Sequence, residues 1–125
     1  MNKKRPVNLA LNTIKFPIMS ITSILHRLSG VFLACLIPIF LFLLHYSLRS
    51  KEHFLLLQGY FAHPLSKLII WGCLSSLIYH LFAGVRHMVM DIGIGEDVAS
   101  AKLTSMILLI VTALAVVGLG VWIWR

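Results

Sequence analysis

The string YHLFAGVRHMVMD, residues 79–91, holds the side chains whose type and spacing are best suited to chemistry. His80, Gly84 and His87 follow one another at spacings of four and three, so on a helix they share one stripe. His80 would then lie about 10 Å inside the end of a long apolar run. A neutral imidazole at that depth needs a partner, which is either a metal ion or a polar group on a neighbouring helix.

The neighbours of His80 favour a haem iron over a hydrogen bond to another helix. Gly84, one turn along, leaves room for a flat ring to approach the backbone. Arg86 and His87 come near the end of the run, where they could meet two carboxylates such as haem propionates. The spacing therefore predicts a haem lying along this helix with His80 as its iron ligand. Hydrogen bonding of His80 to a neighbouring helix is the alternative.

A second polar group occurs in the string SILHRLSG, residues 23–30. Ser23, His26 and Arg27 are spaced by three and four, which places them on neighbouring positions of one helical face. Serine and arginine donors suit a carbonyl or an anionic group. The alternative is an arginine that reaches from the membrane edge to lipid headgroups.

The elements that position both groups are membrane helices. Hydrophobic residues make up 59% of the 125 residues and charged residues 12%, whereas a soluble domain has about 25% charged residues. The mean hydropathy is +0.93. The net charge of +7 does not indicate nucleic-acid binding, because the basic residues lie at the ends of apolar runs, as the positive-inside rule requires. Membrane lipid is therefore the expected surrounding.

The chain is predicted to be one all-α integral membrane domain, residues 1–125, with three transmembrane helices. Each apolar run is long enough for a hydrocarbon core, which needs about 20 residues. Between the runs we expect a polar connector at 49–63 and a short loop at 91–101. The expected spans, after a cytoplasmic arm at 1–20, are about 24–48, 65–90 and 102–124.

Charge sets the expected orientation. Three spans put the termini on opposite sides, and the N-terminal side is richer in lysine and arginine: Lys3, Lys4, Arg5, Lys15 and Arg27. We therefore expect a multi-pass membrane protein whose N-terminus and 91–101 loop lie in the cytoplasm and whose C-terminus lies on the opposite side of the membrane.

The same topology brings the start of the first span and the end of the second to one membrane surface. The Ser23–Arg27 group should meet Arg86 and His87 there, together with Asp91, the single acid of the set. Asp91 could pair with His87 four residues earlier. A polar pocket at the membrane edge beside a haem suits a lipid-soluble redox carrier such as a quinone.

A haem with two axial ligands needs a second chain. His80 is the one histidine deep in these runs, so the other ligand must come from elsewhere. Three helices also make a thin bundle. Both considerations predict an obligate membrane partner.

With these strings on the page, the chain resembles the cytochrome b membrane-anchor subunit of succinate dehydrogenase, respiratory complex II. The matching strings are RPVNL (5–9), SILHRLSG (23–30) and HLFAGVRHMVMD (80–91). The last fits the family pattern His-x-x-x-Gly-x-Arg-His-x-x-x-Asp. The arm NLALNTIKFP resembles the enterobacterial-type branch of the large anchor (the C subunit), and it lacks the Ser-Pro-His segment common in the mitochondrial branch.

The resemblance implies a subunit that supports catalysis done elsewhere. A flavoprotein subunit would oxidise succinate, and an iron–sulfur subunit would carry electrons to ubiquinone at the membrane. His80 matches the axial ligand of haem b iron, and a second small anchor would supply the other ligand. Asp91 matches a residue near the quinone and haem end.

The resemblance also assigns the residues of the first span. Ser23, Ile24 and Arg27 match the quinone site. His26, Arg27 and His87 match the region around the haem propionates.

Three alternatives belong to other classes. A quinol:fumarate reductase anchor has the same architecture and runs the reaction in reverse. A haem-free membrane anchor would use His80 only for packing. A small transporter subunit would need charges deep in several spans, yet none lies between Lys102 and Arg125.

Overall fold

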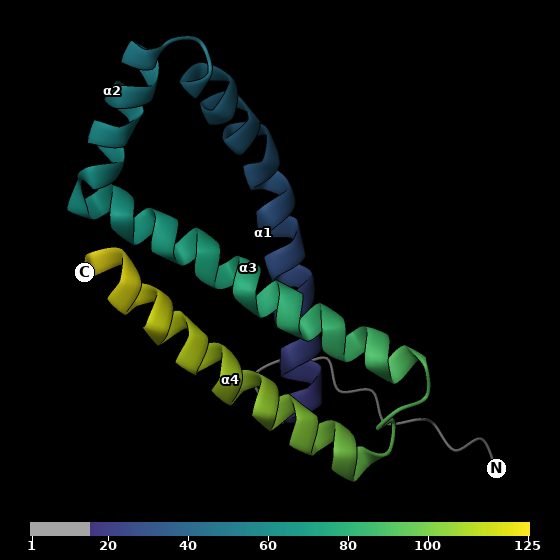
Figure 1. Ribbon diagram of the computed structural model, residues 1–125. Helices are drawn as coiled ribbons and strands as arrows, with labels where there is room; N and C mark the ends of the chain where they lie inside the picture. Colours follow the sequence, from purple (N-terminus) through teal and green to yellow (C-terminus); the bar gives the residue numbers. More distant parts are fainter. Residues whose placement is uncertain (1–15) are drawn as a thin grey trace, which may run out of the picture.

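The computed structural model describes residues 16–125 and folds this part of the chain into four helices (Figure 1). Three of them, of 30, 28 and 27 residues, are long and apolar enough to cross a membrane. The all-α membrane fold is thus confirmed, and each expected span overlaps one long helix. Residues 1–15 of the expected arm lie outside the described part. The helices are α1 (Ile18–Ser47), α2 (Lys51–Ala62), α3 (Pro64–Asp91) and α4 (Val98–Trp124).

The connector expected at 49–63 is instead largely helical, and the charged residues of α2, Lys51 and Glu52, occupy only its first turn. Ser50 caps the helix by accepting a hydrogen bond from the backbone N–H of His53 at 3.3 Å. Apolar side chains follow, and most of them are exposed: Phe54, Leu55, Leu56, Tyr60 and Phe61. At 12 residues, α2 is about 18 Å long and too short to span a bilayer.

α3 and α4 run antiparallel and side by side, and α1 crosses them (Figure 1). The start of α1, the end of α3 and the start of α4 meet at one end of the molecule, which we call the histidine end. Towards the opposite end, the far end, α1 diverges from α3. There α2 joins the two helices and closes an open triangle.

Small residues form the point where α1, α3 and α4 meet. Ala83, Thr22 and Ser105 are almost completely buried, with 1%, 1% and 0% of their surface exposed. The hydroxyls of Thr22 and Ser105 lie 3.4 Å apart, and the Tyr79 hydroxyl donates to the carbonyl of Thr22 at 2.7 Å. Small side chains let membrane helices approach closely enough for such bonds. This junction fixes α1 against the second half of α3.

The end of α3 is closed by a Schellman motif. The N–H of Gly93 donates to Met90 and the N–H of Ile94 donates to Val89, at 2.9 and 3.3 Å. Gly93 has a φ of 84°, which strongly favours glycine. The chain therefore reverses within a few residues and starts α4 at the same end.

Asp97 begins α4. Its carboxylate accepts a hydrogen bond from the backbone N–H of Ser100 at 2.9 Å, and this bond lowers the pKa of Asp97. The negative charge also lies at the positive end of the helix dipole.

The outer faces of the long helices are apolar. Val31, Leu114 and Val117 are examples of side chains whose surface is more than half exposed. Such a surface would be costly in water and matches the lipid chains of a membrane.

Candidate functional site

Three histidines gather between α1 and α3 at the histidine end. The ring of His26, from α1, stacks on His80 of α3 with centroids 4.4 Å apart and planes inclined by 23°. On its other side, His26 lies 5.0 Å from the ring of His87, inclined by 32°. The structure thus brings together three residues that the sequence singled out, from two strings far apart in the chain.

The hydrogen bonds of His80 determine which ring nitrogen carries the proton. Its Nδ1 lies 3.2 Å from the carbonyl oxygen of His26 and 3.0 Å from the hydroxyl of Ser29. A carbonyl oxygen can only accept, so Nδ1 must be the N–H donor. The Ser29 hydroxyl uses its own hydrogen on the same His26 carbonyl, at 2.8 Å, so it too accepts from Nδ1. The neutral His80 ring therefore has its lone pair on Nε2.

This tautomer fits a metal-bound histidine. Nε2 of His80 has no hydrogen-bond partner within residues 16–125. Metal-binding histidines commonly donate their other N–H to a carbonyl or similar acceptor, as His80 does. The described residues contain no cluster of three or more metal-binding side chains. A single iron already held by a porphyrin needs no such cluster from this chain.

Gly30 allows α1 to approach the ring of His80. A Cβ atom at Gly30 would lie 3.0 Å from Cε1 of His80, closer than ordinary contact. The glycine is thus a packing requirement of the His80 position. Sequence reasoning had assigned no role to Gly30 or Ser29. A spacing of three and four from His26 would have placed both on the face that packs against α3.

The sequence predicts that a haem approaches Gly84, but the ring that lies beside Gly84 in the structure is the imidazole of His26. A Cβ atom at Gly84 would lie 3.5 Å from Nε2 of His26. That nitrogen is buried and has no hydrogen-bond partner within the described range. A buried, unsatisfied imidazole nitrogen is costly, and a carboxylate such as a haem propionate is a suitable partner for it. The donor set here therefore fits a haem on two counts, the free Nε2 of His80 and the orphaned Nε2 of His26.

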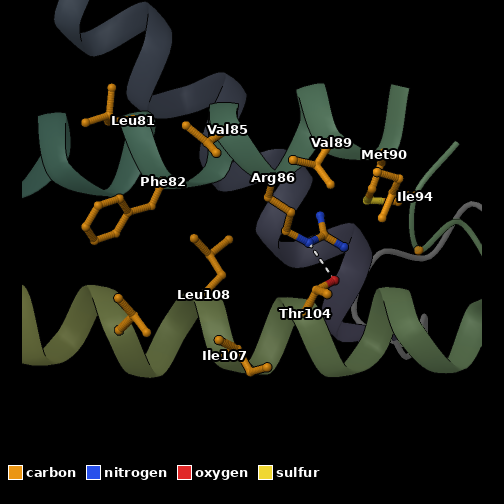
Figure 2. Close-up of a pocket in the computed structure, with 12 residues that line it drawn as sticks. Leu81, Phe82, Val85, Arg86, Val89, Met90, Ile94, Thr104, Ile107 and Leu108 are labelled. Atoms are coloured by element: carbon orange, nitrogen blue, oxygen red, sulfur yellow. Dashed lines mark hydrogen bonds between the residues drawn. The ribbon is translucent and has the colours of Figure 1, made fainter. Parts of the chain in front are cut away.

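Arg86 does not accompany His87, and this expectation is wrong. Its Nε donates to the hydroxyl of Thr104 and one terminal nitrogen donates to the carbonyl of Ala101, both at 3.0 Å. Figure 2 shows the guanidinium directed at α4 inside a groove of about 540 Å³. Consecutive helical residues point about 100° apart, so Arg86 faces α4 while His87 faces α1.

The polar residues Ser23, His26 and Arg27 of α1 do not all face the same way. His26 faces α3 together with the buried Thr22 and Ser29. Arg27 is exposed and Ser23 is half-buried. The two residues share a side of the helix by their spacing of four, and that side differs from the one that carries His26. Ile24, beside Ser23, is exposed as well.

Asp91 is the last residue of α3 and is exposed. It lies at the histidine end, as expected. Within the described part of the chain it forms no ion pair with His87, whose ring faces His26 instead.

Comparisons with known proteins agree on one family. The model of the family described as the succinate dehydrogenase/fumarate reductase transmembrane subunit matches residues 1–119. A relative from Coxiella burnetii, named succinate dehydrogenase cytochrome b556 subunit, is 43% identical over 99% of this chain and 100% of its own. A cytochrome b560 subunit from Reclinomonas americana is 32% identical over 87% of this chain and 79% of its own. A cytochrome b556 subunit from Paracoccus denitrificans is 30% identical over 84% and 81%.

Proposed function

Because this chain belongs to the family of succinate dehydrogenase/fumarate reductase transmembrane subunits, we propose that His80 binds haem b and that the histidine end forms part of a ubiquinone site. The chain serves as the membrane-anchor cytochrome b subunit of succinate dehydrogenase. It is a non-catalytic subunit of a succinate:quinone oxidoreductase, and its partners include a flavoprotein and an iron–sulfur subunit.

The observation that carries the haem proposal is the pair of contacts that Nδ1 of His80 makes. Its Nδ1–H is held by the carbonyl of His26 and the hydroxyl of Ser29, which leaves Nε2 free for iron. His26 and His87 stand beside it as partners for the propionates, and the unsatisfied Nε2 of His26 supports that role. Bound haem supplies one-electron redox chemistry. The chain orients the His80 ligand through the two contacts at Nδ1.

A second small anchor subunit should supply the other haem ligand. His26 is the histidine nearest to His80, but the two rings are stacked face to face. Because the His26 ring is stacked on His80 in this way, His26 would not serve as the second ligand. We assign that ligand to another chain, and His80 would be the one that this chain supplies.

Quinone binding is assigned to Ser23, Ile24 and Arg27. The Arg27 guanidinium and the Ser23 hydroxyl are donors on one side of α1, and both suit the carbonyl oxygens of a quinone. Exposed Ile24 offers apolar contact beside them. Asp91 lies at the same end and could hold or move a proton at its carboxylate. Arg27 also remains a partner for a propionate.

The proposed location is the bacterial inner membrane with a cytoplasmic N-terminus and a periplasmic C-terminus. Three candidate spans make the chain a multi-pass membrane protein. The basic N-terminal segment supports a cytoplasmic histidine end, where the iron–sulfur subunit would dock.

The alternatives gain less support. A fumarate reductase anchor shares this family description, but the relatives named above are succinate dehydrogenase subunits. A transporter relay would need its arginines to lie one after another along a path through the membrane, whereas Arg27 and Arg86 point to different surfaces. The haem assignment is tested by a reduced-minus-oxidised spectrum of the purified complex, and the quinone assignment by its succinate–quinone reductase activity.

A further inference from the structure

We propose that Ser29 is a positioning residue for the haem ligand. By accepting a hydrogen bond from Nδ1–H of His80, its hydroxyl sets the donor strength of Nε2 toward the iron and so lowers the haem midpoint potential. The inference rests on the proposed function, because it requires His80 to bind the haem.

The hydrogen bonds of Ser29 allow its hydroxyl to act toward His80 only as an acceptor. Ser29 is buried, with 9% of its surface exposed, and its Oγ donates its only hydrogen to the carbonyl of His26 at 2.8 Å. The oxygen lone pairs are then available to Nδ1 of His80 at 3.0 Å. The bond joins residues 51 positions apart, so it ties the ligand directly to the opposing helix.

Both acceptors of the His80 proton lie within one turn of α1. Besides Ser29, Nδ1 contacts the carbonyl of His26 at 3.2 Å. Gly30, next in sequence, removes the Cβ that would otherwise meet the ring at 3.0 Å. Substituting one side chain can remove the shorter of the two contacts and leave the backbone carbonyl in place.

The direction of the effect follows from charge donation. An acceptor at the far N–H of a ligating imidazole raises the basicity of the coordinating nitrogen, and hydrogen bonding outside the ligands is one means by which a protein tunes a haem. The Ser29 hydroxyl is a better acceptor because it also donates to a carbonyl. A more basic ligand favours ferric over ferrous iron. Loss of the hydroxyl should therefore shift the midpoint potential in the positive direction.

The test is a potentiometric titration of the b-type haem band in the complete membrane complex. Ser29→Ala should give a positive shift, and Ser29→Thr, which keeps a hydroxyl, should return the potential towards that of the unaltered complex. The matched control is Ser75→Ala. Ser75 is a half-buried serine on α3, outside the junction around Thr22, whose hydroxyl donates to the carbonyl of Trp71 at 2.6 Å, and its loss should leave the potential unchanged.

A Ser29→Ala potential equal to that of the unaltered complex, or more negative, overturns the proposal, as does an equal shift in Ser75→Ala. If Ser29→Ala does not retain haem, Ser29→Cys is compared with Ser29→Thr. A thiol is the weaker acceptor, so the cysteine variant should have the more positive potential, and equal potentials overturn the proposal. Absence of haem from the unaltered complex would instead contradict the proposed function.

Discussion

His26 and His80 stack face to face with ring centroids 4.4 Å apart, although 54 residues separate them in the chain. The contact fixes the start of α1 against the second half of α3. It also determines how much space a Cβ atom would have at each of two glycines. Gly84 lies beside His26, and Gly30 lies beside His80.

A first prediction compares these two glycines. Gly30→Ala should reduce the haem content of the purified complex, because the new Cβ would lie 3.0 Å from Cε1 of His80 and displace the ligand ring. Overpacking of this kind costs about 1–3 kcal/mol. Gly84→Ala should retain nearly all of the haem, since its Cβ would make an ordinary contact at 3.5 Å. Haem per complex, measured from the reduced spectrum, ranks the two variants. A larger loss in Gly84→Ala would mean that the haem, not His26, lies against Gly84.

A second prediction concerns the hydrogen bond between α3 and α1. Tyr79→Phe removes the 2.7 Å bond to the carbonyl of Thr22 while keeping the ring. Hydrogen bonds between membrane helices are worth about 0.6 kcal/mol on average, so a small loss of resistance to detergent denaturation is expected. The haem spectrum should not change, because His80 is held by other groups. A changed haem band in this variant would show that Tyr79 affects the ligand.

A third prediction separates quinone reduction from succinate oxidation. Arg27→Leu and Ser23→Ala should slow succinate–quinone reductase activity, because they remove donors to the quinone carbonyls. Hydrogen bonds that involve a charged group are worth about 1.5–3 kcal/mol, so Arg27→Leu should reduce the activity by about ten- to hundredfold. Succinate oxidation measured with a soluble dye should remain intact.

Arg49→Leu is the control for these variants. Arg49 is an exposed arginine at the far end, after α1, and its loss should affect neither assay. Equal losses of quinone and dye activity in Arg27→Leu would indicate a failure of assembly and contradict a quinone-specific role.

Much of the fold is predictable because lipid imposes simple requirements. A span needs about 20 apolar residues, and the three runs satisfy this in their composition. The first span begins earlier than expected, at Ile18, because a hydroxyl side chain in its first turns can bond to the backbone of the same helix. The Thr22 hydroxyl, for example, donates to Met19 at 3.0 Å. The helix α2 replaces most of the expected connector, because the charges of Lys51 and Glu52 belong to its first turn alone.

The sequence predicts which site residues share one face of a helix. It predicts less well which neighbouring helix each face contacts. The spacing of His80, Gly84 and His87 identifies one stripe of α3. Arg86 and His87 are adjacent in sequence but contact different helices, because neighbours on a helix point about 100° apart. The contacts of Ser29 and Gly30 with His80 depend on how α1 crosses α3. That crossing is set by the small-residue junction around Thr22 and Ala83, which a single helix does not reveal.

The most direct test of the central claim is a reduced-minus-oxidised spectrum of the detergent-purified complex with unaltered chain, His80→Ala and His45→Ala. His45 is an exposed histidine near the far end of α1 and controls for the loss of an imidazole. We expect a sharp b-type band in the unaltered complex and in His45→Ala, and its loss or strong weakening in His80→Ala. An unchanged band in His80→Ala, or no haem in the unaltered complex, would contradict the assignment of His80 as the haem ligand.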